Sequence, residues 1–279
     1  MNIPTIEGTI DRRLLVNYRV DPHYLQRLLP GPFRPMRIHG MGIAGICLIR
    51  LKQIRPRALP ALLGLSSENA AHRIAVEWEE NGTYREGVYI PRRDTSSQFN
   101  TFFGGKLFPG VHHHAHFQVT EGDDSFHIQI ASDDGETRVA VEARVTSQLP
   151  EHSIFASLEE ASAFFEQGSL GYSVTKEVGR LDSLELRCLN WKVEPLQVTK
   201  AQSSFFDDPQ RFPPGSVELD CALLMRAIRH EWYVREPFRS TDSLVEARSF
   251  NATGGRTSSI NTLVTPNREQ RLNEMMRSE

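Results

Sequence analysis

Four of the chain's histidines stand close together in the run VHHHAHF at residues 111–117. Alternate side chains of a β-strand share a face, so His112, His114 and His116 would lie on one side of a strand and His113 on the other. Two histidines two residues apart on a strand can bind one metal ion if a third ligand comes from elsewhere.

No aspartate or glutamate stands out in the sequence as that third ligand. The simpler interpretation is that His112, His114 and His116 form the polar face of an amphipathic strand, and we expect no metal. His113, on the apolar face, is expected to be a hydrogen-bonded residue of the core.

A second group is the run PRRD at residues 91–94. Two guanidinium groups can form a fork that binds a carboxylate or a phosphate, and Asp94 could hold one of the two arginines in place. The alternative is a solvated strand end that carries a surface ion pair. The residues themselves leave both interpretations open.

Lysine is scarce, since only five of the 32 basic residues are lysines and 27 are arginines. Lysine can lose its proton and attack a carbonyl, whereas arginine stays protonated at any working pH. Lys106 lies in a glycine-rich loop that no helix follows, so that loop is not a phosphate-binding loop. The chain also contains no G-x-G-x-x-G, Walker or G-x-S-x-G motif.

The composition is that of an ordinary globular protein, with 39% hydrophobic residues and a formal net charge of -3. Nothing in it supports nucleic-acid binding, and three widely separated cysteines argue against a disulfide framework and a structural zinc site. No apolar segment has the length of a signal peptide or a membrane span. We therefore expect a cytoplasmic protein without a membrane partner.

Strand-like segments dominate, with short helices expected at 23–29 and 158–167. The absence of strand–helix alternation excludes a doubly wound nucleotide-binding fold and leaves antiparallel barrels and sandwiches, which hold small ligands in their mouths. We expect one mainly β domain over residues 1–239, followed by a loosely ordered tail over 240–279. The expected strands span residues 13–20, 41–51, 73–79, 84–90, 111–119, 125–131, 137–146, 172–178, 183–193 and 217–234.

Several motifs are similar to those of a known superfamily. The segments LLVNYRVD at 14–21 and LLPGPF at 28–33 resemble the N-terminal strand and helix of acetoacetate decarboxylase, and REGVYIPRR at 85–93 is similar to its R-E-x-x-x-x-P-K-K segment. The runs at 45–51, 65–73 and 107–113 more closely resemble an uncharacterised bacterial family of the acetoacetate decarboxylase-like superfamily. This resemblance, over about residues 8–235, implies a cone-like antiparallel β-barrel with a central small-molecule cavity.

The resemblance also implies where the chemistry would lie. In acetoacetate decarboxylases the first lysine of the K-K pair forms a Schiff base with the substrate, and the second lowers its pKa. Arg92 aligns with the first lysine, Arg93 with the second and Arg12 with an arginine of the pocket. Because a guanidinium cannot form an iminium, we do not expect acetoacetate decarboxylation by the Schiff-base route.

The sequence therefore predicts a cavity that binds a small anionic metabolite, a carboxylate, without a cofactor. The candidate ligand-binding residues are Arg12, Arg92, Arg93, Asp94 and Lys106. Whether the chain is an enzyme stays open. The alternatives are an enzyme that uses the histidine strand for metal binding or acid–base catalysis, a lyase with Lys106 as a relocated nucleophile, and a structural module with a filled interior. Related barrels often associate, so a homo-oligomer is compatible with the resemblance.

Overall fold

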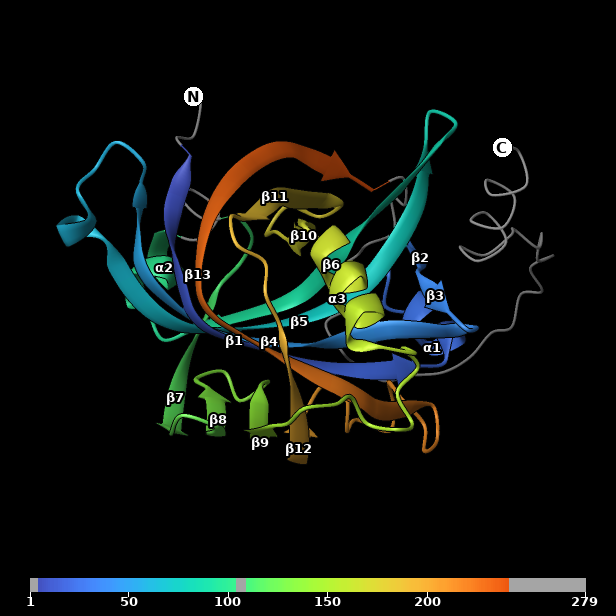
Figure 1. Ribbon diagram of the computed structural model, residues 1–279. Helices are drawn as coiled ribbons and strands as arrows, with labels where there is room; N and C mark the ends of the chain where they lie inside the picture. The colour runs from blue at the N-terminus through green and yellow to red at the C-terminus, as the bar shows by residue number, and fades with distance from the viewer. Residues whose placement is uncertain (1–4, 104–108, 241–279) are drawn as a thin grey trace, which may run out of the picture.

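A computed structural model describes residues 5–103 and 109–240 (Figure 1). The expected tail and Lys106 thus lie outside the described residues, apart from Ser240. Strands dominate, which confirms the predicted mainly β class. The strands are β1 (Ile6–Val20), β2 (Arg34–Pro35), β3 (Arg37–Ile38), β4 (Met41–Pro56), β5 (Leu65–Glu80), β6 (Thr83–Thr95), β7 (His113–Glu121), β8 (Ser125–Ser132), β9 (Arg138–Val145), β10 (Leu170–Val174), β11 (Arg180–Cys188), β12 (Glu194–Ser203) and β13 (Val217–Arg239). The helices are α1 (Pro22–Gln26), α2 (Gln98–Phe103) and α3 (Leu158–Gln167), with a 3₁₀ turn η1 (Ala61–Leu63).

Local sequence signals explain the helix starts and the tightest hairpin. Asp21 begins α1 by accepting a hydrogen bond from the backbone N–H of His23 at 2.8 Å. Ser157 caps α3 in the same way, its hydroxyl accepting from the N–H of Glu160 at 3.2 Å. Asn81 and Gly82 take positive φ angles of 52° and 75° between β5 and β6, as a type I′ turn requires.

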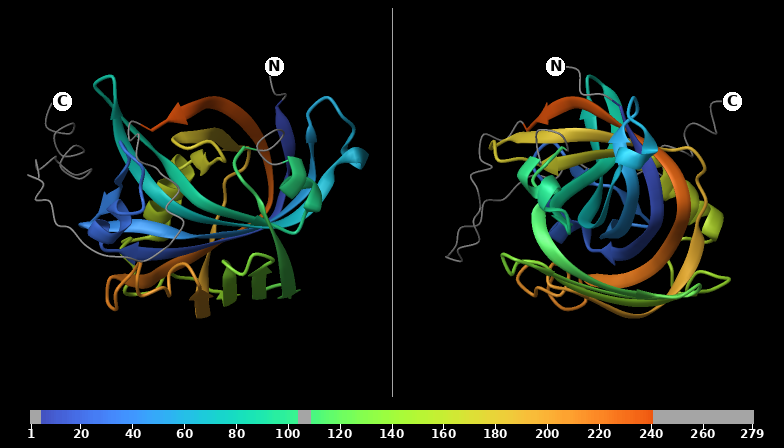
Figure 2. Two further views of the ribbon diagram at one scale, coloured as in Figure 1. Left: turned by 180° about the vertical axis from the view of Figure 1, so that it is seen from behind. Right: turned by 90° about the vertical axis from the view of Figure 1, so that its left-hand side faces the viewer.

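The strands form one sheet that closes on itself twice (Figure 1 and Figure 2). One closed circuit, which we call the cavity ring, runs β6–β5–β4–β1–β13–β11–β10 and back to β6. The other, the packed ring, runs β6–β7–β8–β9–β12–β13–β1–β4–β5 and back to β6. The two rings share β13, β1, β4, β5 and β6, so these strands have one face toward each ring.

The long strand β13 makes the second closure possible. One of its edges pairs with β1 over residues 217–232, and the other edge pairs first with β12 over residues 222–224 and then with β11 from Cys188↔His230 to Arg180↔Arg239. The sequence predicted a strand over residues 217–234, and the segment is strand throughout.

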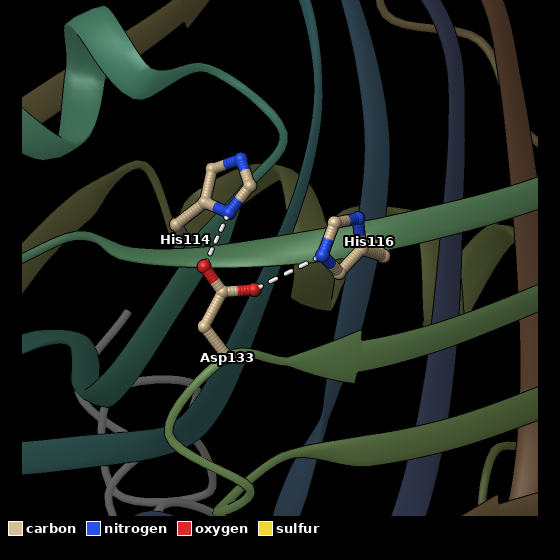
Figure 3. Close-up of side chains that lie close together, drawn as sticks. All are labelled: His114, His116 and Asp133. Carbon is tan, nitrogen blue, oxygen red and sulfur yellow. Dashed lines mark hydrogen bonds and ion pairs between the residues drawn. The ribbon is translucent and has the colours of Figure 1, made fainter.

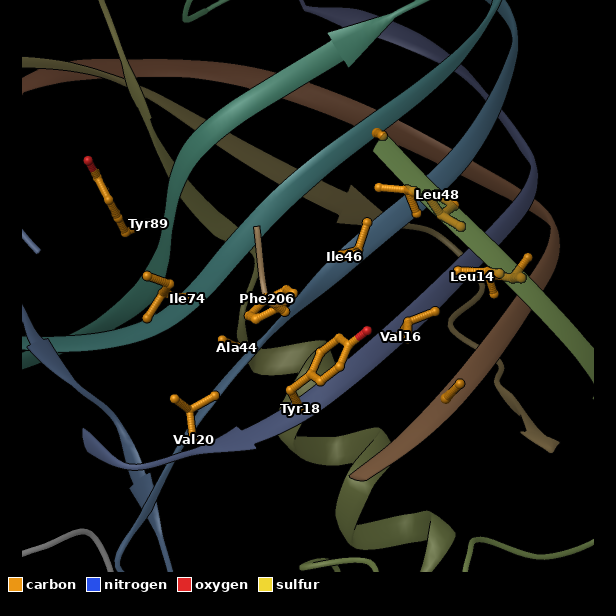
Figure 4. Packing of buried hydrophobic residues seen from close by; sticks show 14 of the residues in the cluster. Leu14, Val16, Tyr18, Val20, Ala44, Ile46, Leu48, Ile74, Tyr89 and Phe206 are labelled. Atoms are coloured by element: carbon orange, nitrogen blue, oxygen red, sulfur yellow. The ribbon is translucent and has the colours of Figure 1, made fainter. Parts of the chain in front are cut away.

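Apolar side chains fill the packed ring. Leu14, Val16 and Tyr18 of β1 lie opposite Leu48, Ile46 and Ala44 of β4, and all are buried (Figure 4). Burial of one such leucine or valine stabilises the fold by about 1.5–3 kcal/mol. The same cluster takes in buried residues of β8, β9 and the loop after β12: Phe126, Ile128, Ile130, Val139, Val141, Ala143 and Phe206.

The opposite face of the shared strands carries a separate cluster. Leu15 and Cys47 pack there with Phe164 and Phe165 of α3. This second cluster is less complete because it surrounds the cavity described below. No helix in the described part of the chain is long and apolar enough to cross a membrane.

Candidate functional site

The cavity ring encloses a cavity of about 160 Å³. This volume is comparable to a cavity that admits benzene, so it suits a small molecule. Every strand of the ring contributes to the wall, as does α3. The wall is largely apolar, with Leu15, Met36, Ile49, Leu51, Ile54, Leu65, Val88, Ile90, Phe164, Phe165, Leu184, Leu186 and Trp232 among the lining residues.

Three arginines, Arg13, Arg73 and Arg93, interrupt this apolar wall. Each is held by a neutral partner. The Nε of Arg13 donates to the Cys47 sulfur at 3.2 Å, and the Nε of Arg93 donates to the Ser173 hydroxyl at 2.9 Å.

Arg73 is held in a similar way, since its Nη2 donates to the side-chain oxygen of Asn17. Its guanidinium also lies 4.9 Å from the centre of the Phe165 ring. Among the described residues, no carboxylate forms an ion pair with Arg13, Arg73 or Arg93. The wall also contains the carboxylates of Glu86 and Asp94, but among the described residues neither forms an ion pair with these arginines, so no ion pair compensates their positive charges.

Strand register explains why these arginines meet. Leu15, Cys47, Ala71 and Arg93 pair in one row across β1, β4, β5 and β6. The other two arginines lie two residues away from this row, one on either side of it. They are therefore on the same face of the sheet as the row.

On one side Arg13 pairs with Ile49, and on the other Arg73 pairs with Gly45. The glycine leaves room, because a Cβ at position 45 would come within 2.4 Å of the Val16 carbonyl oxygen and 3.4 Å of Arg73 Nη2. The three arginines thus flank Cys47 from several directions.

Desolvation shapes the charges in this cavity. Burial lowers the pKa of Arg93 to about 10. It also lowers the pKa of Arg73 to about 10, where the positive charge of Arg13 adds to the effect and the Cys47 thiol opposes it. Both guanidinium groups stay protonated near neutral pH, at a cost that an anion in the cavity would offset.

Arg12, which sequence analysis proposed for the pocket, lies on the packed-ring side. Its Nη2 is 2.6 Å from Glu68 Oε2 and its Nη1 is 2.8 Å from Glu121 Oε2. Arg50 bridges the same two carboxylates. Arg12 does not line the cavity, and its charge is compensated within the protein.

Arg92 and Arg93 face opposite ways, as adjacent residues of a strand must. Arg92 lies outside the cavity wall, with its Nε 2.9 Å from Asp94 Oδ1 and its Nη1 2.9 Å from Asp134 Oδ2. Hydrogen bonds from Arg92 hold the pKa of Asp134 well below its usual range. Asp94 belongs to the wall, but its carboxylate is fully buried and also accepts from the Thr137 hydroxyl at 3.0 Å.

The histidine cluster divides between three environments. His112 precedes β7 and lines the cavity, where its Nδ1 is 3.3 Å from the Gly110 carbonyl oxygen. Burial, together with the nearby charge of Arg93, lowers its pKa to about 3, so its imidazole is neutral near neutral pH. The expected shared face of His112, His114 and His116 does not form, because β7 begins only at His113.

The prediction of a core position for His113 is wrong. Its side chain is 36% exposed, and its Nδ1 lies 2.9 Å from Asp134 Oδ2. The reason is its place at the first residue of β7, beside the Arg92–Asp134 ion pair rather than in the filled part of the ring. His114 and His116 lie on the other face of β7 and do not line the cavity.

No lysine lines the cavity among the described residues. Lys52, the lysine nearest to the site in sequence, is half-exposed and its Nζ lies 2.9 Å from Asp11 Oδ1. The three cysteines are free thiols.

Sequence reasoning missed Arg13 and Arg73. Arg13 is adjacent to Arg12, the residue that the resemblance proposed for the pocket. The prediction therefore differs from the structure by one position along β1. Arg73 stands next to His72, which is buried in the packed ring. Only the pairing of Arg73 with Gly45 of β4, which the sequence does not reveal, brings it to the cavity.

Comparison with solved structures identifies the fold as that of acetoacetate decarboxylase-like proteins. An acetoacetate decarboxylase-like enzyme from Sphingomonas wittichii RW1 is similar with a TM-score of 0.54 and 12% identity, over 86% of this chain and 93% of that one. The enduracididine biosynthesis enzyme MppR complexed with pyruvate gives 0.53 and 15%, over 86% and 91%. Acetoacetate decarboxylase from Legionella pneumophila gives 0.53 and 10%, over 85% and 90%.

A family model places the chain more narrowly. The family DUF2071, described as an uncharacterized conserved protein, matches residues 8–248, and the chain belongs to it. A search of curated proteins gave no significant match. The predicted resemblance to a family of the acetoacetate decarboxylase-like superfamily is therefore confirmed.

Proposed function

We propose that the protein binds a small carboxylate metabolite in the cavity ring, through Arg13, Arg73 and Arg93. The observation that carries this proposal is the set of three guanidinium groups in the cavity wall that form no ion pair with a carboxylate among the described residues, two of them, Arg73 and Arg93, with pKa values lowered by burial. Buried charges are normally paired, and an unpaired set around a cavity points to a ligand of the opposite sign. The proposal keeps Arg93 from the predicted set and replaces Arg12 and Arg92.

The wall indicates what kind of carboxylate fits. Guanidinium groups bind a carboxylate through charge-assisted hydrogen bonds, while the apolar side chains would contact the rest of the molecule. The pyruvate complex of MppR, which shares the fold, makes 2-oxo acids the first ligands to test. The free thiols fit the reducing cytoplasm that the proposal assumes.

Binding without a Schiff base is the second part of the proposal. It is supported by arginine at both positions that align with the lysine pair of acetoacetate decarboxylases, and by the lack of lysine in the described cavity wall. Borohydride treatment in the presence of pyruvate or acetoacetate, followed by mass spectrometry, tests it. We expect no adduct, and an adduct on any lysine, Lys106 included, would contradict this part alone.

Calorimetric titration tests the binding itself. Pyruvate and acetoacetate are titrated into the full chain, with acetone as a probe that lacks the carboxylate. We expect heat of binding from at least one of the two acids and none from acetone.

Variants then locate the site. Arg93→Met should weaken acid binding tenfold or more, whereas Arg92→Met, on the opposite face of the same strand, should leave the dissociation constant within about twofold. Equal losses in both variants, or acid binding that Arg93→Met does not change, would contradict the assignment.

A further inference from the structure

A second cluster of polar side chains lies away from the cavity, where β7 meets the turn between β8 and β9 (Figure 3). His114 Nδ1 is 2.7 Å from Asp133 Oδ2, and His116 Nε2 is 3.2 Å from Asp133 Oδ1. The candidate ligand atoms of the three residues all lie within 4.8 Å of one another. This is the third ligand whose absence from the sequence pattern argued against a metal.

The fold holds Asp133 in this place. Its backbone N–H donates to the carbonyl oxygen of His114 at 3.0 Å, which ties the turn to β7. The turn itself is closed by a hydrogen bond from the N–H of Gly135 to the carbonyl oxygen of Ser132, also at 3.0 Å. The carboxylate therefore meets the two imidazoles because the backbone brings it there.

The neighbouring aspartate shows what distinguishes this carboxylate. Asp134 pairs with the guanidinium of Arg92 as well as with His113. Asp133 faces only His114 and His116, since no arginine or lysine of the described residues forms an ion pair with it. At Asp133 a carboxylate and two imidazoles meet without a permanent cation.

We propose that His114, His116 and Asp133 bind a divalent transition-metal ion. Two imidazole nitrogens and one carboxylate oxygen suit Zn²⁺, Ni²⁺ or Cu²⁺, whereas Mg²⁺ and Ca²⁺ prefer sites built from oxygen. Zinc bonds to these ligands are about 2.0–2.2 Å long, so closure requires only small movements of side chains that are partly exposed. The metal would link β7 to the β8–β9 turn.

This site does not share residues with the cavity wall. Its loading is therefore separable from carboxylate binding, and the proposal stands whether or not the cavity binds a 2-oxo acid.

Titration of Zn²⁺ into the untagged, full-length protein tests the proposal, with Mg²⁺ as a second probe. We expect one equivalent of Zn²⁺ to bind and no response to Mg²⁺. His116→Ala and Asp133→Asn should each weaken zinc binding tenfold or more. Because the His116 side chain is 76% exposed, circular dichroism should show an unchanged fold.

A matched control is His127→Ala, which removes a histidine of β8 that lies 3.6 Å from a single carboxylate, Glu142. It should leave zinc affinity within about twofold. As a second readout, Zn²⁺ should raise the urea midpoint of the wild type but not of His116→Ala. No binding, or an equal loss in the His127 variant and the His116 variant, would overturn the proposal.

Discussion

The two rings share five strands but differ in what fills their interiors and in how their arginines are paired. The packed ring is filled by apolar side chains, and two arginines on its side, Arg12 and Arg92, are each paired with two carboxylates. The cavity ring leaves about 160 Å³ open, and its arginines lack such partners among the described residues. Charges that the protein compensates itself contribute to its stability, whereas charges left uncompensated are available to a ligand.

The arginines come in adjacent pairs on β1 and β6. Arg12 and Arg92 lie on the side of the packed ring, and their neighbours Arg13 and Arg93 line the cavity. A shift of one position along a strand therefore decides whether an arginine is paired with carboxylates or lines the cavity. This difference makes the comparison testable, because substitution of a paired arginine should lower stability more than substitution of an arginine in the cavity wall.

The largest difference between the rings should appear on truncating leucines. Leu14→Ala removes a fully buried side chain from the packed ring and should lower the free energy of unfolding by about 3–4 kcal/mol. Leu184→Ala, in the cavity wall, should cost less than about 1 kcal/mol, since its side chain borders open space. Urea denaturation of both variants checks this, and equal losses would show that the two interiors are packed alike.

The paired arginines give the next effect. Arg12→Met leaves Glu68 and Glu121 with Arg50 as their remaining cation, and we expect a loss of about 2 kcal/mol in unfolding free energy, because the carboxylates are only partly buried. Arg73→Met removes a charge that no carboxylate pairs but also the hydrogen bond to Asn17, and it should cost less than about 1 kcal/mol. Thermal and urea unfolding at pH 7 measure both, and a larger loss for Arg73→Met would reverse the comparison.

The packed ring should also respond to pH through His72. Burial lowers the pKa of His72 to about 3, and the positive charges of Arg92 and Arg211 add to this. The folded protein thus keeps the imidazole neutral, while the unfolded chain binds a proton below about pH 6.5. Stability is therefore lost as the pH falls below 6.5, by up to about 1.4 kcal/mol per pH unit from this residue.

The glutamine variant of His72 isolates this contribution. Unfolding free energies of the wild type and His72→Gln, measured from pH 7 to pH 5, should show a shallower pH dependence for the variant. Parallel curves would mean that His72 binds protons alike in the folded and unfolded states.

The smallest effect should come from an exposed lysine. Lys52→Gln removes a half-exposed ion pair with Asp11 and should change stability by less than about 0.5 kcal/mol. Pyruvate binding should be unchanged. A loss of binding in this variant would favour a lysine-dependent site over the arginine cavity.

The comparison also shows how far sequence could lead. The sequence predicted the helix at 158–167 and the strands at 73–79 and 84–90, and these correspond to α3 and the β5–β6 hairpin. The resemblance proposed Arg12 and not Arg13 for the pocket, and alternation could not correct this, because it does not say which face of the strand borders a cavity. The positions of Arg73 and Asp133 could not be predicted from the sequence for a related reason. Both depend on which strands and turns become neighbours in three dimensions.

The histidines of residues 112–116 show that a shift of one residue in the start of a strand also changes a predicted site. The pattern grouped His112 with His114 and His116, but β7 begins one residue later, so that His112 lines the cavity and the other two meet Asp133. Element boundaries are set by tertiary pairing, which periodicity does not contain.

The unfolding of Arg93→Met by urea, with and without pyruvate, tests the central claim most directly. If the guanidinium of Arg93 is an uncompensated charge kept for a ligand, the variant will be at least as stable as the wild type without pyruvate, and pyruvate will stabilise only the wild type. A variant that loses more than about 1 kcal/mol and is still stabilised by pyruvate would contradict the account, because Arg93 would then serve the fold and not the ligand.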